Sequence, residues 1–189
     1  MRSKKTDLRI IKTKKSLYES LLDLMREKPF EELKVSDICE NALVNRSTFY
    51  SHFDDKYDLL DSWSCDLKEG LSEELSKNTN ISNSKEYYLE MIKLLLDHIE
   101  DKKDVYAMVL INNKNGVGMD MVYDALNEDV TKRIEIEGHK LNRGIPSSII
   151  AKFYLGAVFN LGREWLISNN KYSKEEIISY LEDLLPDVL

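Results

Sequence analysis

Apolar residues recur at spacings of three and four along most of the chain, which predicts a succession of helices. In the first, at about residues 6–28, Leu17, Leu21 and Leu24 form an apolar stripe and Pro29 ends the helix. Further helices are expected at about 56–76, with Asp54 or Asp55 as its cap, and at 85–102, 105–111 and 119–141. Two more follow: one has Pro146 as its expected first residue, and the other begins with a capping box of Ser173 and Glu176. Only 7 Gly and 3 Pro leave little room for a turn-rich β architecture, so the predicted fold class is all-α.

The stretch 35–58 has a different pattern: a short helix, a tight turn, a second short helix and the start of a third. Ser36 is expected to cap the first of these helices and Asn45 the second. Phe49 and Phe53 lie four residues apart and are predicted to face inward. The outward positions are then Arg46, Ser47, Thr48, Tyr50 and His52. Small, polar and basic side chains on a short helix suit the major groove of DNA.

This stretch also resembles a known family. Residues 45–53 (NRSTFYSHF), followed by DDKYDLL, resemble the recognition helix and the next helix start of TetR/AcrR-type transcriptional regulators. The sequence resemblance is strong over about residues 8–62. In the rest of the chain only the succession of predicted helices resembles the family. The resemblance implies a three-helix DNA-binding domain at 1–58, with its helix-turn-helix at about 34–53, and a helical ligand-binding and dimerisation domain at 59–189. The family usually has Gly where this chain has Leu43. A left-handed backbone conformation is expected at this turn position, and it costs a leucine about 1 kcal/mol more than a glycine.

The resemblance implies roles for residues of the recognition helix and the start of the next helix. Tyr50 and Lys56 would grip the DNA backbone, while residues 45–48 and His52 would face the bases; an inconsequential surface position is the alternative for His52. The complete set of predicted DNA-binding residues is Lys14, Ser36, Asn45, Arg46, Ser47, Thr48, Tyr50, His52 and Lys56.

The net charge of −7 is distributed unevenly. Residues 1–60 hold 12 Lys/Arg against 11 Asp/Glu, and residues 1–15 alone hold seven Lys/Arg against one Asp. The rest of the chain holds 15 basic against 23 acidic residues. A basic end can bind phosphates with release of counterions, and an acidic body would repel DNA from other faces. A solvated tail without a partner is the alternative.

The helix at 85–102 is apolar around most of its circumference, which predicts burial on several sides. In the family this position walls a ligand cavity; a densely filled core helix is the alternative. The candidate cavity residues are Tyr87, Met91, Leu95, His98, Tyr106, Met119, Tyr123 and Tyr154.

The last two helices are predicted to form a homodimer interface, as the resemblance implies. Apolar residues recur along both, and Gly156 and Gly162 suggest the close approach of another helix. The predicted interface residues are Phe153, Ala157, Leu161, Trp165, Ile178, Leu181 and Leu185. Closure of the monomer core is the alternative. A two-fold dimer would place two reading helices about one helical turn of DNA apart.

The sequence does not suggest an enzyme. His52, His98 and His139 are isolated from one another, and neither a nucleophile elbow nor a zinc-binding HExxH motif is present. No cofactor or metal is therefore expected, although a sensor site built from His98, His139 and acidic residues remains an alternative. No apolar run approaches the roughly 20 residues of a membrane span. With no signal-peptide core and no disulfide framework, a reduced cytoplasmic protein is expected, with Cys39 in the core.

The sequence is therefore interpreted as a sequence-specific regulator of transcription, responsive to an unknown small-molecule effector. We expect a repressor that binds a palindromic operator on double-stranded DNA as a homodimer. The alternative is a protein-binding co-regulator that keeps the fold but has lost operator reading. The residue pattern identifies neither the effector nor the operator.

Overall fold

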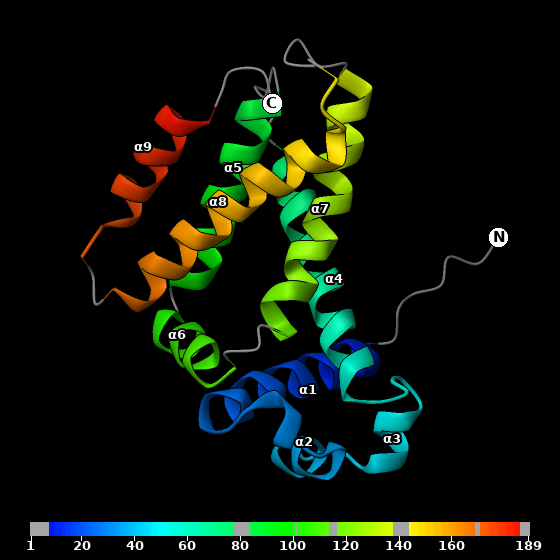
Figure 1. Cartoon of the computed structure of the whole chain (residues 1–189). Coiled ribbons are helices and arrows are strands. Elements are labelled where there is room, and N and C mark those ends of the chain that lie inside the picture. The colour runs from blue at the N-terminus through cyan, green and yellow to red at the C-terminus, as the bar shows by residue number, and fades with distance from the viewer. Residues whose placement is uncertain are drawn as a thin grey trace, which may run out of the picture.

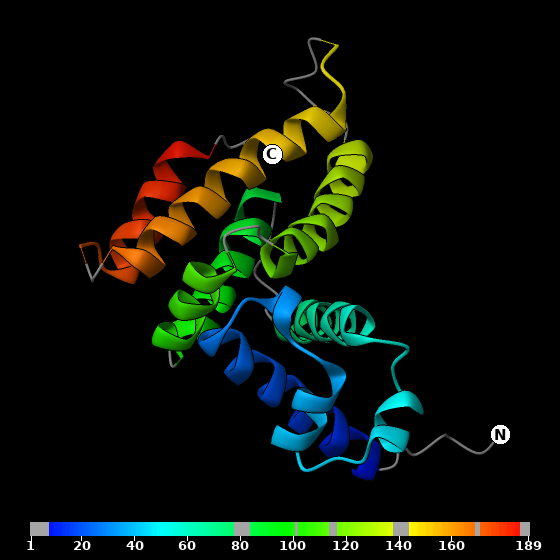
Figure 2. The same cartoon turned by 60° about the horizontal axis from the view of Figure 1, so that its bottom comes forward.

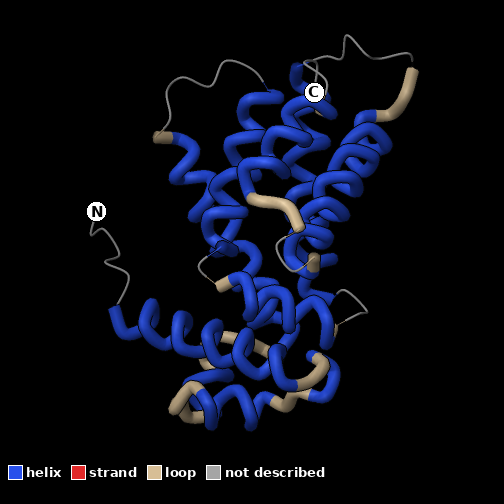
Figure 3. Tube along the Cα trace, turned by 90° about the vertical axis from the view of Figure 1, so that its left-hand side faces the viewer, coloured by secondary structure: helices blue, strands red, loops and turns tan. Residues whose placement is uncertain are grey.

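The computed structural model describes residues 8–77, 84–100, 102–113, 117–137, 144–168 and 171–185. These residues form helices and connecting loops and contain no strand, which confirms the all-α prediction (Figure 3). In chain order the elements are α1 (Leu8–Glu27), the 3-10 helix η1 (Phe30–Glu32), α2 (Val35–Asn41), α3 (Arg46–Tyr50), α4 (Lys56–Ser76), α5 (Ser84–Glu100), α6 (Lys103–Asn112), α7 (Val117–Glu137), α8 (Ser147–Ile167) and α9 (Lys174–Leu184).

The helices are arranged as a small unit at one end and a larger body above it (Figure 1). Helices α1, α2 and α3 make the small unit, and α4 runs from it into the body, where it packs on α5 and α7. Helix α8 packs on both α7 and α9. Helix α6 contacts α1 on one side and α8 on the other, so that it lies between the two parts (Figure 2).

Two hydrophobic clusters correspond to these parts. The first joins α1, η1, α2, α3 and the start of α4, and its fully buried side chains include Leu17, Phe30 and Phe49. The second joins α5, α7, α8 and α9 around Trp165 and Ile177, each 1% exposed. Because Leu59 and Leu60 of α4 belong to the first cluster, this helix is anchored in the small unit before it enters the body.

Several predicted helix ends are confirmed. The Asp55 side chain accepts hydrogen bonds from the backbone N–H groups of Tyr57 (2.8 Å) and Asp58 (2.9 Å), so it caps α4. Ser173 and Glu176 form the predicted capping box of α9. Cys39, at 4% exposure, lies in the core as expected.

Other predicted caps are wrong by one or two positions. Helix α2 begins at Val35 with Lys34 at the N-cap, and the carboxylate of Asp37 accepts from the Lys34 N–H. Ser36 is therefore inside the helix, because the Asp37 carboxylate supplies the capping acceptor. Pro146 is the N-cap of α8 instead of its first residue. Asn45 does occupy the N-cap of α3, but its side chain makes no capping hydrogen bond.

The two glycines of α8 do not mark close packing within the chain. A Cβ built on Gly156 or on Gly162 would meet no heavy atom of the described residues within 4 Å. Both positions therefore have room for a side chain within the described part of this chain, and the close approach of a helix from a second copy stays a prediction.

Candidate DNA-binding site and body cavity

The turn between α2 and α3 has the left-handed residue that the sequence predicted. Leu43 has φ +55°, and the Val44 N–H donates to the Cys39 carbonyl at 2.9 Å in the manner of a Schellman motif. Its side chain is 94% exposed. The turn thus adopts the conformation usual for Gly with a leucine that makes almost no compensating contact.

Leu43→Gly is accordingly expected to stabilise the protein. Gly adopts positive φ without the steric cost of a Cβ, and the leucine gives up almost no burial. We expect the free energy of unfolding to rise by about 1 kcal/mol, which is roughly 2–4 °C in Tm for a chain of this size. Thermal unfolding followed by circular dichroism measures it, with Ala42→Gly as a helical-φ control that should destabilise.

Three side chains fix α2 and its turn against α1, and the sequence pattern did not indicate them. Ser20 Oγ donates to the Ile38 carbonyl at 2.9 Å and also accepts from Asn41 Nδ2 at 3.1 Å. Ser16 Oγ donates to the Ala42 carbonyl at 3.0 Å. Ser16 thus supplies a donor to a carbonyl at the C-terminal end of α2, where a helix lacks its own donors, while the Ile38 carbonyl accepts from Ser20 in addition to the Ala42 N–H. These hydrogen bonds set the direction from which α3 begins.

Helix α3 combines a buried anchor with a free outer face. Phe49 is fully buried, and its ring packs on Phe53 at a centroid distance of 5.6 Å. The opposite face carries the predicted reading residues: Asn45, Arg46, Ser47 and Tyr50 are exposed, while Thr48 and His52 are half-buried. The packing thus leaves a short polar ridge at the end of the molecule.

Two other predicted DNA-binding residues are partly engaged within the chain. Lys14 Nζ donates to Ser62 Oγ of α4 at 3.2 Å and lies 5.6 Å from the centre of the Phe53 ring. Ser36 Oγ donates to Asp37 Oδ1 at 3.3 Å. Both side chains remain half-buried, so neither is as freely presented as Arg46.

Lys56 differs most from its predicted role as a phosphate contact. Its ammonium donates to three backbone carbonyls in and just after η1, those of Phe30 (2.9 Å), Glu31 (2.9 Å) and Leu33 (3.0 Å). The same nitrogen lies 4.7 Å from the centre of the Phe30 ring. An ammonium has three N–H donors, and all three are occupied here. The structure therefore places Lys56 as a clamp between α4 and η1.

The end of α6 is hydrogen-bonded to the small unit through two asparagines. Asn113 Oδ1 accepts from the Phe30 N–H at 2.5 Å, and its Nδ2 donates to the Met25 carbonyl at 3.2 Å. Asn112 Nδ2 donates to the Arg26 carbonyl. A shift of α6 would break hydrogen bonds to both α1 and η1, so this joint connects the body to the small unit.

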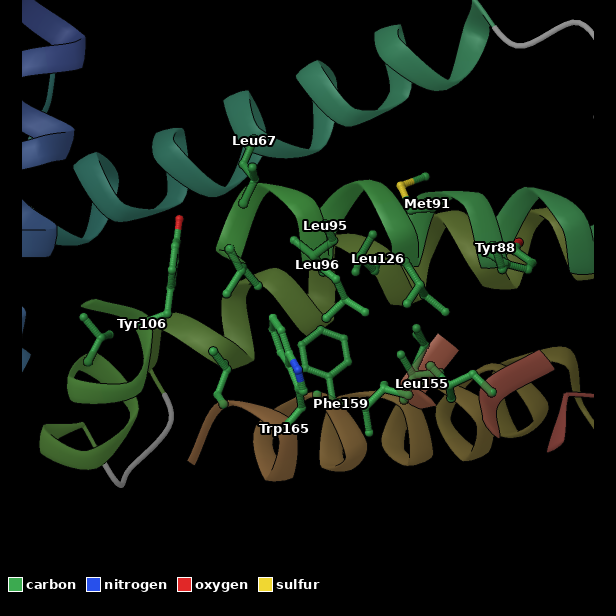
Figure 4. Close-up of a pocket in the computed structure, with 18 of the residues that line it drawn as sticks. Leu67, Tyr88, Met91, Leu95, Leu96, Tyr106, Leu126, Leu155, Phe159 and Trp165 are labelled. Carbon is green, nitrogen blue, oxygen red and sulfur yellow. The ribbon is translucent and has the colours of Figure 1, made fainter. Parts of the chain in front are cut away.

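The body contains a cavity of about 150 Å³ that reaches from this joint to α9. Leu22 and Met25 of α1 line one end, and Leu181 and Leu185 line the other. Figure 4 shows Phe159 and Trp165 pointing from α8 toward Leu95 and Leu96 of α5, with Tyr106 entering from α6. The cavity is therefore bounded by side chains from both parts of the molecule.

The predicted cavity residues divide into two groups. Met91, Leu95, Tyr106 and Tyr154 line the cavity. The other described candidates do not. The Arg133 guanidinium lies 3.5 Å from the centre of the Tyr87 ring, and the Tyr123 hydroxyl donates to the Lys152 carbonyl at 3.3 Å. His98 Nε2 lies 3.0 Å from the Tyr106 hydroxyl, on the exposed side. The side chain of Met119 is outside the described residues.

The predicted dimer residues divide similarly. Phe153 and Ala157 are exposed, and Leu161 and Ile178 are half-buried. Trp165, Leu181 and Leu185 are 1–5% exposed and line the cavity instead, so their prediction as interface residues is wrong. They belong to the hydrophobic cluster of the body, so the pair α8 and α9 also closes the monomer core.

The metal alternative finds no support among the described residues, which include no group of three His, Cys, Asp or Glu side chains that could hold an ion. His139 lies outside them. Among the described helices, none combines the length and the apolar character that crossing a bilayer needs.

Comparison with known proteins agrees with this geometry. Residues 17–62 match the family described as "Bacterial regulatory proteins, tetR family", and residues 86–187 match "Transcriptional regulator C-terminal region". The chain is 26% identical over 180 residues to the dhaKLM operon transcriptional activator DhaS of Lactococcus lactis, covering 92% of this chain and 88% of DhaS.

Solved structures show the same fold. A TetR transcriptional regulator from Streptococcus agalactiae superposes with a TM-score of 0.66 at 26% identity, covering 94% of this chain and 96% of that one. A protein described as a TetR-family regulator from Syntrophomonas wolfei gives 0.68 at 22% identity, covering 90% and 91%. The chain therefore belongs to the TetR family of bacterial transcriptional regulators, with the DNA-binding helix-turn-helix at its N-terminus.

Proposed function

We propose that this protein is an effector-responsive repressor that binds a palindromic operator as a homodimer in the cytoplasm. In this proposal residues 1–58 read the DNA, and residues 59–189 bind the effector and the second copy. The observation that carries it is the exposed polar face of α3 over the fully buried Phe49. A helix anchored on one side and free on the other fits the major groove.

Selection of binding sites from random duplex DNA tests this proposal. Enrichment of a two-fold symmetric sequence, with half-sites about one helical turn apart, is the expected result. Binding that falls steeply with salt and enriches no sequence would contradict it. That outcome would support the alternative, a protein-binding co-regulator that has lost operator reading.

The outer face of α8 supports the homodimer. Ile149 (55% exposed), Phe153 (71%) and Ala157 follow one another at spacings of four and form one apolar stripe. On the neighbouring α9, Leu184 (68%) and Tyr180 (42%) are also exposed. A second copy related by two-fold symmetry would cover the same surface on both chains.

Phe153→Asp is expected to separate the dimer. A charged side chain at the centre of an apolar interface loses the aromatic contact and buries an unpaired charge. The dissociation constant of the dimer should rise at least about 30-fold, as for the loss of a contact worth about 2 kcal/mol. Sedimentation velocity across a concentration series measures it. Ile136→Asp, at a still more exposed apolar position on α7 (84% exposed), should leave the dimer intact.

The proposed response is a shift between two populations of the dimer. An effector that binds better to one spacing of the two reading units stabilises that spacing and so changes operator affinity. The asparagine joint at the end of α6 supports this proposal, because it ties the cavity walls to the start of η1.

A second candidate function is activation of transcription instead of repression. DhaS of Lactococcus lactis is named as a transcriptional activator, and the similarity covers nearly the whole chain. A reporter carrying the selected operator, measured with and without the protein, distinguishes activation from repression.

A further inference from the structure

The body cavity has an almost wholly apolar surface. No Asp, Glu, Lys, Arg or His is among the described residues that line it. We infer that the cavity takes an uncharged, apolar molecule of about the size of one aromatic ring, and that it rejects a charged ligand of equal size. This inference rests on the proposed role of the cavity as the effector site.

Two polar side chains at the cavity wall, those of Asn113 and Tyr106, are engaged within the protein. The Asn113 amide is engaged by Phe30, Met25 and Val109 through hydrogen bonds of 2.5–3.2 Å. The Tyr106 hydroxyl is 3.0 Å from His98 Nε2, and burial raises the pKa of Tyr106 to about 12. A ligand carboxylate or ammonium would lose its hydration without gaining an ion pair, because no charged side chain is among the described residues that line the cavity, and this is strongly unfavourable.

The volume limits the size of the ligand. An engineered cavity of about 150 Å³ lined by Leu, Ile and Phe in another protein stays dry and binds benzene or xenon. The present cavity has the same volume and similar walls, with Phe159, Trp165 and Tyr106 added (Figure 4). Aromatic walls favour edge and face contacts with a ligand ring. A molecule of roughly six to ten non-hydrogen atoms is expected.

Toluene and benzoate make a matched pair of probes, because both carry one ring and only benzoate is charged. Toluene at about ten times its Kd should raise the Tm by roughly 2–6 °C, whereas benzoate at the same concentration should leave it unchanged. An equal shift with both probes would overturn the inference.

Two glycines of α8 provide the matched variants. Gly162 lines the cavity and Gly156 does not, yet an added Cβ meets no described atom within 4 Å at either. Gly162→Leu should fill the space and abolish the toluene shift, and Gly156→Leu should retain it. An undiminished shift in folded Gly162→Leu would place toluene elsewhere and contradict the assignment.

Xenon provides a measurement that needs no variant. The ¹²⁹Xe chemical shift of the wild-type protein should change with xenon pressure and revert when toluene is added. Absence of both xenon and toluene binding would overturn the inference. Neither experiment uses DNA, so the result is independent of operator selection, which tests the proposed function separately.

Discussion

Arg46→Ala is expected to change which operator sequences the protein prefers. Arg46 is exposed in the first turn of α3, where a guanidinium can donate two hydrogen bonds to the edge of a guanine. Losing such a contact should lower discrimination at one base pair of each half-site by about 1–3 kcal/mol, or roughly 5- to 150-fold. Fluorescence anisotropy on the selected operator and its single-base variants measures the change.

Arg26→Ala is the matched control, because Arg26 is basic and exposed but lies at the far end of α1. It should bind every operator variant like the wild type. Equal weakening of all operators by Arg46→Ala would instead assign the side chain to the phosphate backbone.

Lys56→Ala is expected to destabilise the DNA-binding unit. The change removes the ammonium that three carbonyls in and just after η1 share, and leaves those carbonyls without that donor. Hydrogen bonds to charged groups are strong, so a loss of about 2 kcal/mol in unfolding free energy is expected, or roughly 4–8 °C in Tm. Operator affinity should fall as well, because η1 leads directly into α2.

The salt dependence of binding separates a clamp from a phosphate contact. If Lys56 only positions η1, Lys56→Ala should show the same slope as the wild type in a plot of log K for operator binding against log salt concentration. Loss of a phosphate contact would reduce its magnitude by about 0.9. Tyr50→Phe is the comparison: the exposed hydroxyl can be removed without loss of Tm, yet we expect weaker binding to all operators. A smaller slope with an unchanged Tm in Lys56→Ala would restore its role as a DNA contact.

The apolar periodicity of α8 does not by itself distinguish residues that face the monomer core from residues that face outward. Phe153 and Trp165 belong to the same recurring apolar pattern in α8, yet Phe153 is 71% exposed and Trp165 is 1% exposed. They are 12 positions apart, which is a rotation of roughly 120° at 3.6 residues per turn. A helix with apolar residues over so wide an arc has two surfaces to cover, and the pattern does not say which neighbour covers each.

The sequence by itself determined the all-α class, the Phe49 anchor with its polar outer face, the cap of α4 to within two neighbouring aspartates and the capping box at Ser173, while the left-handed turn at Leu43 was expected from the family resemblance. Each depends on residues within a few positions of one another, where backbone geometry fixes the outcome. Only the tertiary structure decided the Lys56 clamp, the Asn113 joint and the cavity walls. Asn113 meets Phe30 across 83 positions, and contacts at such separations depend on how whole helices pack.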